Sequence, residues 1–304
     1  MTDANKEIMS IKVGLIGLDT SHVTAFAEIF KTQQVPGAQV VCGFPGGSPD
    51  FDLSINRVAG YTKRLTEEFG VTILASPAAV AEQADLVFLT SVDGRVHYRQ
   101  FAEIVKFKKP TFIDKPFTTT IADAQAIIDL SAKTGVPIMS ASALRYVDNF
   151  QAALTGDADQ GRIVGIDTYG PMELHDSQPG LFWYGIHGIE MIVAALGVGC
   201  RRVQAMTTDE VDLISFQWSD GRSATYRGSR KAHNKFGAVV HRQKVARQID
   251  VGAAKRPMTV CLLEAILRTL PAGKTDVPVA ETLEIVRVIC AANESRKTGH
   301  AVNL

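Results

Sequence analysis

The first half of the chain alternates short apolar runs, rich in β-branched residues, with segments of helical periodicity. The apolar runs cover residues 11–17, 38–44, 71–74, 86–91, 110–113 and 137–141, and the helical patterns cover 22–31, 61–69, 77–84, 97–106 and 121–134. This alternation is typical of a parallel sheet with helices on both faces. Right-handed crossovers then predict an α/β fold with a doubly wound, Rossmann-type sheet.

The second half has a different pattern. Helical segments are expected at 145–154, 186–196, 258–270 and 281–296, and strands at 163–169, 211–218, 222–227 and 239–251. Ser219-Asp220-Gly221 is typical of a hairpin turn between two of these strands. We therefore predict a Rossmann domain over residues 1–143 and, over 144–304, an α+β domain with an open, largely antiparallel sheet. A length of 304 residues is sufficient for two such cores.

The composition narrows the class of partner. Lys plus Arg and Asp plus Glu number 32 each, so no net charge favours nucleic acid or an anionic membrane. The first ten residues are polar and no apolar run approaches the roughly 20 residues of a membrane span. The four cysteines, Cys42, Cys200, Cys261 and Cys290, lie far apart in apolar surroundings and indicate free thiols. We expect a cytoplasmic protein with a small-molecule partner.

The loop after the first predicted strand reads Gly17-Leu18-Asp19-Thr20-Ser21-His22. A dinucleotide-binding domain places Gly-x-Gly-x-x-Gly there, and this chain keeps only Gly17. An unpaired Asp19 carboxylate about 4 Å from a phosphate would cost on the order of 4 kcal/mol. In the other interpretation Asp19 turns inward, accepts N–H bonds from Ser21 or His22, and leaves the hydroxyls of Thr20 or Ser21 for a phosphate.

Ligands in such sheets bind where the strand order reverses, between the loops after the first and fourth strands. The candidate cofactor-binding residues there are Gly17, Asp19, Thr20, Ser21, His22, Thr90, Ser91 and His97. After the second strand, the turn Gly46-Gly47-Ser48 is a possible site for a 2′-phosphate and Asp50 for a ribose, with a plain loop equally compatible.

A metal site is a separate possibility at the same edge. Asp19 and His22 follow the first strand, and Asp93 and His97 follow the fourth, so the fold brings two carboxylates and two imidazoles together. The spacing is not specific for a metal. We favour helix capping and packing for these four residues and predict no metal ligands.

Asp114-Lys115-Pro116 after the fifth strand resembles the Glu-Lys-Pro motif of the glucose-fructose oxidoreductase, inositol dehydrogenase and rhizopine-catabolism protein (Gfo/Idh/MocA) family. Three further matches are Ser142-Ala143-Leu144-Arg145, Gly185-Ile186-His187 and Ser295-Arg296-Lys297-Thr298-Gly299. The resemblance spans nearly the whole chain. It implies a Rossmann domain that binds NAD or NADP, with Asp114 and Lys115 near the cofactor. It also implies a second-domain sheet that supports a homodimer or homotetramer, and hydride transfer at a secondary alcohol of a sugar or cyclitol.

Lys115 and His187 are the predicted catalytic residues. A lysine between a strand end and a proline is restricted in its motion, and partial burial lowers the pKa of such an amine toward neutrality. His187 matches the family's histidine, whereas Trp183 stands where the family commonly has an aspartate. An imidazole there acts as an acid or base, or orients the substrate hydroxyl.

Arg145, Tyr146, Trp183 and His187 are the predicted substrate contacts. For Arg145, a structural pair with Asp148 is an equal alternative. Glu190, one helical turn beyond His187, either fixes the tautomer of that histidine or lies on an exposed face.

The leading hypothesis is an NAD(P)-dependent oxidoreductase acting on a polyhydroxylated small molecule. Asp19 and Trp183 motivate a second hypothesis, a ligand-binding or regulatory protein that kept the fold and lost the cofactor. A redox-neutral or metal-dependent lyase or hydrolase on the same fold is the third.

Overall fold

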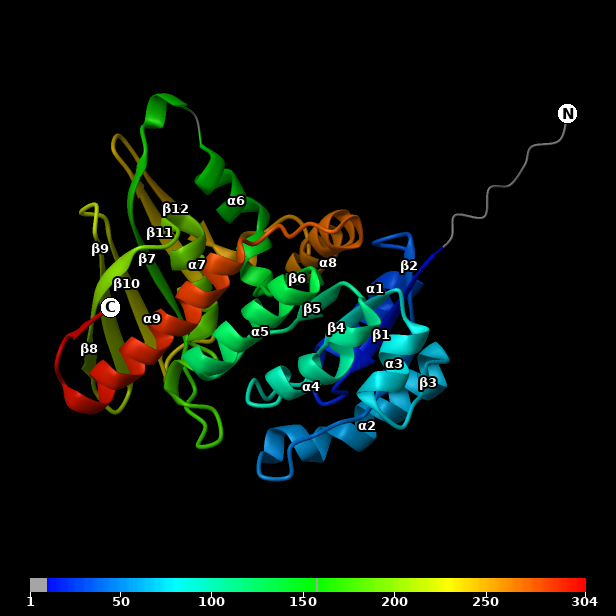
Figure 1. The fold of residues 1–304 in the computed structure, drawn as a ribbon. Coiled ribbons are helices and arrows are strands. Elements are labelled where there is room, and N and C mark those ends of the chain that lie inside the picture. The colour runs from blue at the N-terminus through cyan, green and yellow to red at the C-terminus, as the bar shows by residue number, and fades with distance from the viewer. Residues whose placement is uncertain (1–9, 157) are drawn as a thin grey trace, which may run out of the picture.

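The computed structural model describes residues 10–156 and 158–304, and its first part is a six-stranded parallel sheet (Figure 1). The strands are β1 (Ile11–Ile16), β2 (Ala38–Phe44), β3 (Thr72–Ile73), β4 (Leu86–Leu89), β5 (Thr111–Ile113) and β6 (Ile138–Met139). Their order is β3-β2-β1-β4-β5-β6. The predicted doubly wound sheet is confirmed, and its order reverses between β1 and β4.

Helices cover both faces of this sheet. They are α1 (His22–Lys31), α2 (Asp52–Phe69), α3 (Pro77–Gln83), α4 (His97–Ile104), the 3-10 turn η1 (Val105–Phe107) and α5 (Ile121–Thr134). Residues of α3, α4 and α5 share one apolar cluster and those of α1 and α2 share another. Local sequence sets the ends: the Thr120 side chain accepts a hydrogen bond from the Asp123 N–H at the start of α5, and Gly135 closes that helix with φ 71°.

The second part of the chain contains a seven-stranded sheet in the order β12-β11-β7-β10-β9-β8-β13. Its strands are β7 (Ile163–Pro171), β8 (Cys200–Thr207), β9 (Val211–Trp218), β10 (Ser223–Ser229), β11 (Gly237–Arg242), β12 (Ala246–Asp250) and β13 (Val302–Asn303). Only the β7–β10 pair is parallel among the pairings described. The predicted α+β domain with an open, largely antiparallel sheet is therefore confirmed.

One face of the second sheet is covered by helices. The helical elements of this half are η2 (Ala143–Tyr146), α6 (Asp148–Thr155), η3 (Ala158–Gln160), η4 (Gly180–Phe182), α7 (Ile186–Leu196), η5 (Val251–Ala253), α8 (Met258–Thr269), η6 (Leu270–Ala272) and α9 (Val279–Thr298). Helix α7 packs on β7 and α9 on β8. Along β9, buried and exposed residues alternate, so the opposite face of this sheet is open.

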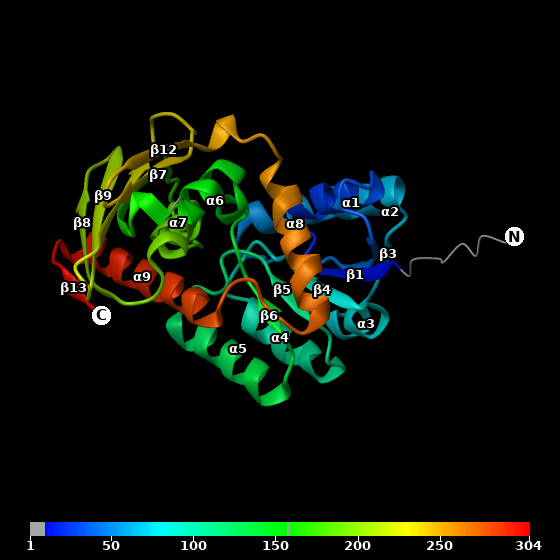
Figure 2. The same cartoon turned by 90° about the horizontal axis from the view of Figure 1, so that it is seen from above.

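Helix α8 returns to the first sheet. Its residues Val260, Leu263 and Ile266 belong to the apolar cluster of α1 and β1, and Figure 2 shows α8 beside α1. Residues 1–143 thus share part of their core with a helix from the far end of the chain. A boundary near residue 143 separates the strands of the two sheets. We propose the same boundary for the two domains.

Several predicted elements differ in extent. The single strand expected at 239–251 is the hairpin of β11 and β12, and β8 and β13 were not predicted. The helix expected at 61–69 begins nine residues earlier, at Asp52, because its first turns are mostly exposed and carry little apolar periodicity. The helix expected at 145–154 is divided at Val147 into η2 and α6.

Two further expectations concern composition. All four cysteines are free thiols, with Cys42 and Cys200 buried and Cys261 and Cys290 partly buried. Within residues 10–156 and 158–304, no helix combines the length and apolar character needed to cross a bilayer. Residues 1–9, on which part of the localisation prediction rests, lie outside the described residues.

Gly17 and Gly37 allow a matched test of the turn after β1. Both have positive φ, +93° and +90°, but a Cβ on Gly17 would collide with Ser91 whereas one on Gly37 would meet nothing within 4 Å. We expect Gly37→Ala to cost about 1–2 kcal/mol through backbone strain alone. Gly17→Ala should cost about 1–3 kcal/mol more because of the collision. Urea unfolding of both variants measures the difference, and equal midpoints would contradict the packing described.

Candidate active site

The loops after β1, β2, β4 and β5 begin at the same level of the sheet. Ile16 pairs with Phe44 on one side and with Leu89 on the other, and Leu89 pairs with Ile113. The carboxyl ends of these strands therefore form one edge. Gly17 takes the chain out of β1 with φ +93°, and the space beside it is filled by Ser91. Glycine is required at this turn because a side chain would displace the β4 loop.

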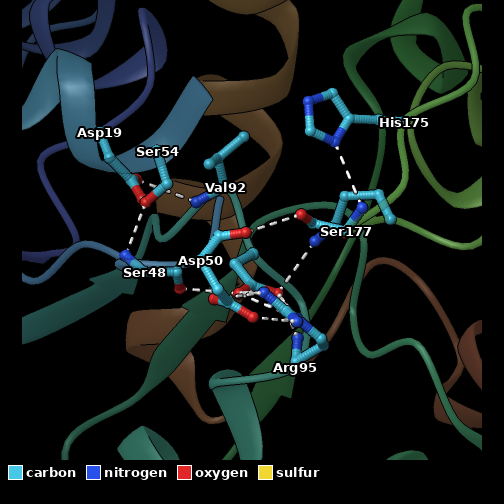
Figure 3. A network of polar contacts seen from close by, with 10 residues as sticks. Asp19, Ser48, Asp50, Ser54, Val92, Arg95, His175 and Ser177 are labelled. Carbon is cyan, nitrogen blue, oxygen red and sulfur yellow. Dashed lines mark hydrogen bonds and ion pairs between the residues drawn. The ribbon is translucent and has the colours of Figure 1, made fainter. Parts of the chain in front are cut away.

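Asp19 lies beneath this edge with no exposed surface. Its carboxylate accepts hydrogen bonds from the Ser54 hydroxyl at 2.5 Å and from the Val92 N–H at 2.9 Å (Figure 3). Burial raises the pKa of Asp19, although these two hydrogen bonds oppose the rise. Asp19 thus turns inward as one interpretation proposed, but the predicted partners were wrong. It joins the loops of α2 and β4 instead of capping α1.

The start of α1 is capped differently from the prediction. The His22 N–H donates to the Thr20 hydroxyl at 3.4 Å, and Ser21 makes no side-chain cap. Thr20 is buried whereas Ser21 is exposed. The His22 and Val23 N–H groups both donate to Thr20, so the exposed Ser21 hydroxyl is the group of this turn that we expect to meet an anion.

A polar network joins three loops around Asp93, which is 1% exposed. Figure 3 shows Ser48, Asp50 and Arg95 of this network. Its carboxylate accepts hydrogen bonds from Ser48 at 2.7 Å, from Gln178 at 3.0 Å and from the Arg95 guanidinium at 2.8–3.1 Å. Arg95 also binds Asp50 through both terminal nitrogens. Since β2 and β4 flank β1, this network crosses the carboxyl end of β1.

The network changes two expectations for the loop after β2. The Asp50 carboxylate is held by Arg95 instead of being free for a ribose. The Ser48 N–H donates to the Ser54 hydroxyl at 2.8 Å, so it is not free for a 2′-phosphate. The Ser177 hydroxyl donates to the Asp50 carbonyl, which extends the contact to the loop between β7 and α7.

An apolar cluster lies beside this network. Phe51 is fully buried, and its ring lies 5.4 Å from Trp183, edge to face, and 4.7 Å from His175. Val92 belongs to the same cluster. Trp183, predicted to contact substrate, is thus largely covered by the first domain, but the Lys115 Nζ lies 5.8 Å from the centre of its ring. The indole forms an apolar wall beside the lysine.

Asp114 connects Lys115 to the loop after β1. Its Oδ2 atom lies 2.5 Å from His22 Nδ1, and its Oδ1 atom accepts the Lys115 N–H at 2.8 Å. The carboxylate is buried, whereas the His22 side chain is 31% exposed. Since β1 and β5 flank β4, the His22–Asp114 contact spans the carboxyl end of β4.

Burial and neighbouring charges shift the pKa values of this pair. Burial lowers the pKa of the Lys115 amine and Arg57 lowers it further, while Asp114 opposes the change. For Asp114 burial acts to raise the pKa, but the charge and hydrogen bond of His22 and the charge of Lys115 outweigh it, so the pKa is lowered. Asp114 is therefore ionised at neutral pH, and Lys115 loses its proton more readily than an exposed lysine.

His187 lies in the first turn of α7, with its Nδ1 atom 2.7 Å from the Ser142 hydroxyl. Tyr184 and Phe236 contact its ring. Burial, and then the positive charges of Lys115 and His22, hold the pKa of His187 well below its ordinary value. The imidazole is thus neutral at neutral pH and shares one electrostatic environment with Lys115 and His22.

Neither expectation for Glu190 agrees with the structure: it does not contact His187, and it does not lie on an exposed face. It is buried and binds Arg145 at 2.6 Å, and Arg145 also binds Glu281 at 2.9 Å. The predicted Arg145–Asp148 pair was wrong. Tyr146 belongs to the apolar cluster that contains α8. Arg145 and Tyr146 are 8% and 9% exposed, which argues against the prediction of substrate contacts. Arg145 joins η2 to α7 and α9, and Tyr146 packs in the core of the first sheet.

Two predicted cofactor contacts lie beneath the site. Thr90 has no exposed surface, and its hydroxyl donates to the carbonyls of Ile16 and Gly17. His97 is also fully buried, with ring nitrogens 2.9–3.1 Å from the carbonyl oxygens of Ser91, Pro116 and Phe117. These side chains fix the loops after β1, β4 and β5 relative to one another.

The residues considered for a metal site have separate partners. Asp19 binds Ser54, His22 binds Asp114, Asp93 binds Arg95 and His97 binds backbone carbonyls. Among the described residues, no group of three or more His, Cys, Asp or Glu side chains is arranged to hold a metal ion.

The edge fits a dinucleotide in its central part. Gly17 supplies the close turn, α1 begins at the point where the turn ends, and the Asp19 carboxylate is directed inward, away from a phosphate. The remaining predicted contacts at this edge are Ser21, His22 and Lys115. Ser21 and α1 suit the pyrophosphate, and Lys115 and His187 suit the reactive end.

Residues 11–142 match the model of the oxidoreductase family with an NAD-binding Rossmann fold. This part of the chain is therefore an NAD-binding Rossmann domain of the oxidoreductase type. The matched model is that of the Gfo/Idh/MocA family, which the motif around Lys115 resembles. No curated protein matches it by sequence.

Solved structures share the fold over almost the whole chain. Apo scyllo-inositol dehydrogenase from Lactobacillus casei has a TM-score of 0.80 at 16% identity, covering 97% of this chain and 98% of its own. GenD2 from gentamicin A biosynthesis, solved with NAD, has a TM-score of 0.80 at 13% sequence identity, and the match covers 100% of this chain and 99% of GenD2. A myo-inositol dehydrogenase from Corynebacterium glutamicum has a TM-score of 0.78 at 15% identity, and the match covers 97% of this chain and 99% of that enzyme. At these identities the likeness establishes the fold.

The raised pKa of Asp19 predicts that this residue lowers the free energy of unfolding by an amount that depends on pH. An aspartate in the unfolded chain titrates near 3.8, and burial moves the pKa of Asp19 above this value. Between the two pKa values the folded protein binds a proton that the unfolded chain has lost, so the stability contributed by this group falls as pH rises. In Asp19→Asn the amide retains an acceptor for Val92 and carries no such cost.

The free energies of unfolding of wild type and Asp19→Asn, measured by urea from pH 4 to pH 7, test this. We expect their difference to move in favour of the asparagine variant as pH rises. A constant difference would show that Asp19 is not desolvated as described. Asp85→Asn is the control, since the Asp85 side chain accepts an exposed backbone N–H.

Proposed function

We propose that this protein transfers hydride between NAD and a secondary alcohol or ketone of a sugar, cyclitol or related polyhydroxylated molecule. Lys115 and His187 are the proposed catalytic residues. The proposal is supported by the position of Lys115 after β5, at the carboxyl edge of the matched Rossmann sheet, and by His187, whose Nδ1 atom is held by Ser142. The positive charge of Lys115 also lowers the pKa of His187. NAD, when bound, supplies the hydride acceptor or donor.

The chain's own residues handle the oxygen and its proton. A neutral Lys115 amine accepts the proton of the substrate hydroxyl when the alcohol is oxidised, and the ammonium returns it when a ketone is reduced. The lowered pKa of Lys115 makes both states accessible. His187 is proposed to orient the same hydroxyl through Nε2, because its Nδ1 atom is occupied by Ser142.

A polyhydroxylated substrate suits the surroundings of Lys115. The buried indole of Trp183 forms an apolar wall behind Lys115, and the polar atoms of Lys115 and His187 are proposed to bind the hydroxyls of the substrate. The solved structures with a similar fold include inositol dehydrogenases, one of them solved with NAD(H) and scyllo-inositol. We therefore choose scyllo-inositol and myo-inositol as the first probes.

Lys115→Met tests the assignment. We expect saturable binding of NADH, seen by fluorescence, in both wild type and variant. The kcat/KM for inositol oxidation should fall about 1,000-fold in the variant, because a thioether cannot exchange the proton. Lys133→Met, at an exposed position of α5, is the matched control and should retain full activity.

Two outcomes would contradict the proposal. One is the absence of saturable NADH or NADPH binding at millimolar concentration in the wild type. The other is unchanged turnover in Lys115→Met under conditions where the wild type is active.

We also propose that copies of the chain associate through the open face of the second sheet. Met206 of β8 and Leu213 of β9 are 62% and 36% exposed, and they face each other across the strand pair. This apolar pair supports a homodimer or homotetramer. Light scattering of wild type and Met206→Glu measures the mass, and a wild-type mass of one chain would reject the assembly.

A further inference from the structure

We propose that His22, held by Asp114, accepts the proton that the substrate releases at Lys115 and passes it to solvent. This inference rests on the proposed function, because it assigns the destination of the proton in the oxidation of the alcohol. His22 stands at a position where the dinucleotide fingerprint has glycine, so no such role is implied by the fingerprint itself.

The geometry fixes which ring nitrogen is free. An ionised carboxylate only accepts hydrogen bonds, so the contact of 2.5 Å with Asp114 Oδ2 requires the proton on His22 Nδ1. In the neutral form of the ring the Nε2 atom then carries the lone pair, and this form accepts a proton to become the imidazolium. The ring also packs on Phe26 at 5.5 Å, which restricts its orientation. A buried carboxylate behind a histidine is a common way to set its tautomer.

Asp114 joins the ring of His22 to the backbone of Lys115. The same carboxylate binds the His22 ring through Oδ2 and the Lys115 backbone N–H through Oδ1. The charges of Lys115 and His22 both lower the pKa of the neutral His187, so the three side chains influence one another. The titratable groups around His22 are thus Asp114 and Lys115 after β5 and His187 on α7, with Arg57 of α2 acting on Lys115.

The exposure of the two histidine side chains indicates which of them receives the proton from Lys115. Burial and the neighbouring positive charges keep His187 neutral, so His187 does not readily accept a proton. His22 keeps 31% of its side chain exposed and has a full negative charge behind it. The ammonium of Lys115 gives its proton to His22 Nε2, directly or across one water, and the imidazolium gives it to bulk water. The amine of Lys115 is thereby restored for the next substrate.

The first test uses the free protein. ¹⁵N-histidine spectra of the full chain should show His22 with the proton on Nδ1, and Asp114→Asn should weaken that preference. His241 is an internal control, because it binds Asp167 through Nε2 at 2.8 Å and should show the opposite tautomer. The His22 signal is assigned from its loss in His22→Asn. Finding the His22 proton on Nε2 would overturn the proposal, whether or not the protein binds NAD.

The second test uses turnover of scyllo-inositol with NAD⁺. His22→Asn keeps a donor near the Nδ1 position for Asp114 and removes Nε2. We expect kcat to fall about 100-fold with little change in KM, and added imidazole to restore part of the loss. His241→Gln, at the surface pair, should leave kcat unchanged. Full activity of His22→Asn, or a loss that imidazole does not restore, would overturn the proposal.

Binding of NADH to the same variants separates the two proposals. If the wild type neither binds NADH nor turns over inositol, the proposed function fails, and the tautomer of His22 still decides whether Asp114 prepares this ring as a proton acceptor. If NADH binds to wild type and His22→Asn alike and only kcat responds, the role of His22 is supported.

Discussion

The candidate site depends on three carboxylates that are buried at one edge of the first sheet. Asp19 follows β1, Asp93 follows β4 and Asp114 follows β5, and each is at most 3% exposed. A buried carboxylate is costly unless other groups donate hydrogen bonds to it. Because the donors come mainly from other loops, each aspartate fixes the position of a neighbouring segment, and together they define the shape of the edge.

The donors show how each loop is placed. Ser54 brings the start of α2 to Asp19, and Ser48 and Gln178 bring the β2 loop and the second half of the chain to Asp93. His22 brings the start of α1 to Asp114. The interface between the domains is therefore largely polar near Asp93 and apolar around Phe51 and Trp183. Trp183 fits this arrangement, since its indole packs edge to face against Phe51.

Much of the fold was predictable because its sequence signals are local. The strands of the first sheet and α1, α5 and α7 follow from the apolar period, and the order of the strands follows from the handedness of crossovers. The hairpin between β11 and β12 was missed because its turn, residues 243–245, contains no Gly, Pro, Asn or Asp. The start of α2 was missed because its exposed first turns lack a periodic apolar face.

The sequence predicted several residues of the candidate site, but it did not predict which residues they contact. Lys115 and His187 were found from motifs, and they do share one environment. The partner of Asp19 lies 35 residues away, that of His22 lies 92 away and those of Arg145 lie 45 and 136 away. Sequence spacing carries no signal for such pairs. Arg95, Phe51 and Ser142 were not proposed as site residues for the same reason, although Ser142 stood in a motif.

The return of α8 to the first sheet has a consequence for how the chain acquires its structure. The apolar face shared by α1 and β1 is covered by three residues of α8, Val260, Leu263 and Ile266. The ribosome adds these residues long after the first sheet is complete. During synthesis, part of the core of the Rossmann half therefore stays exposed until α8 has been made. For the same reason, a fragment ending near residue 143 would be a poor autonomous module, and exchange of this half between relatives would have to include α8.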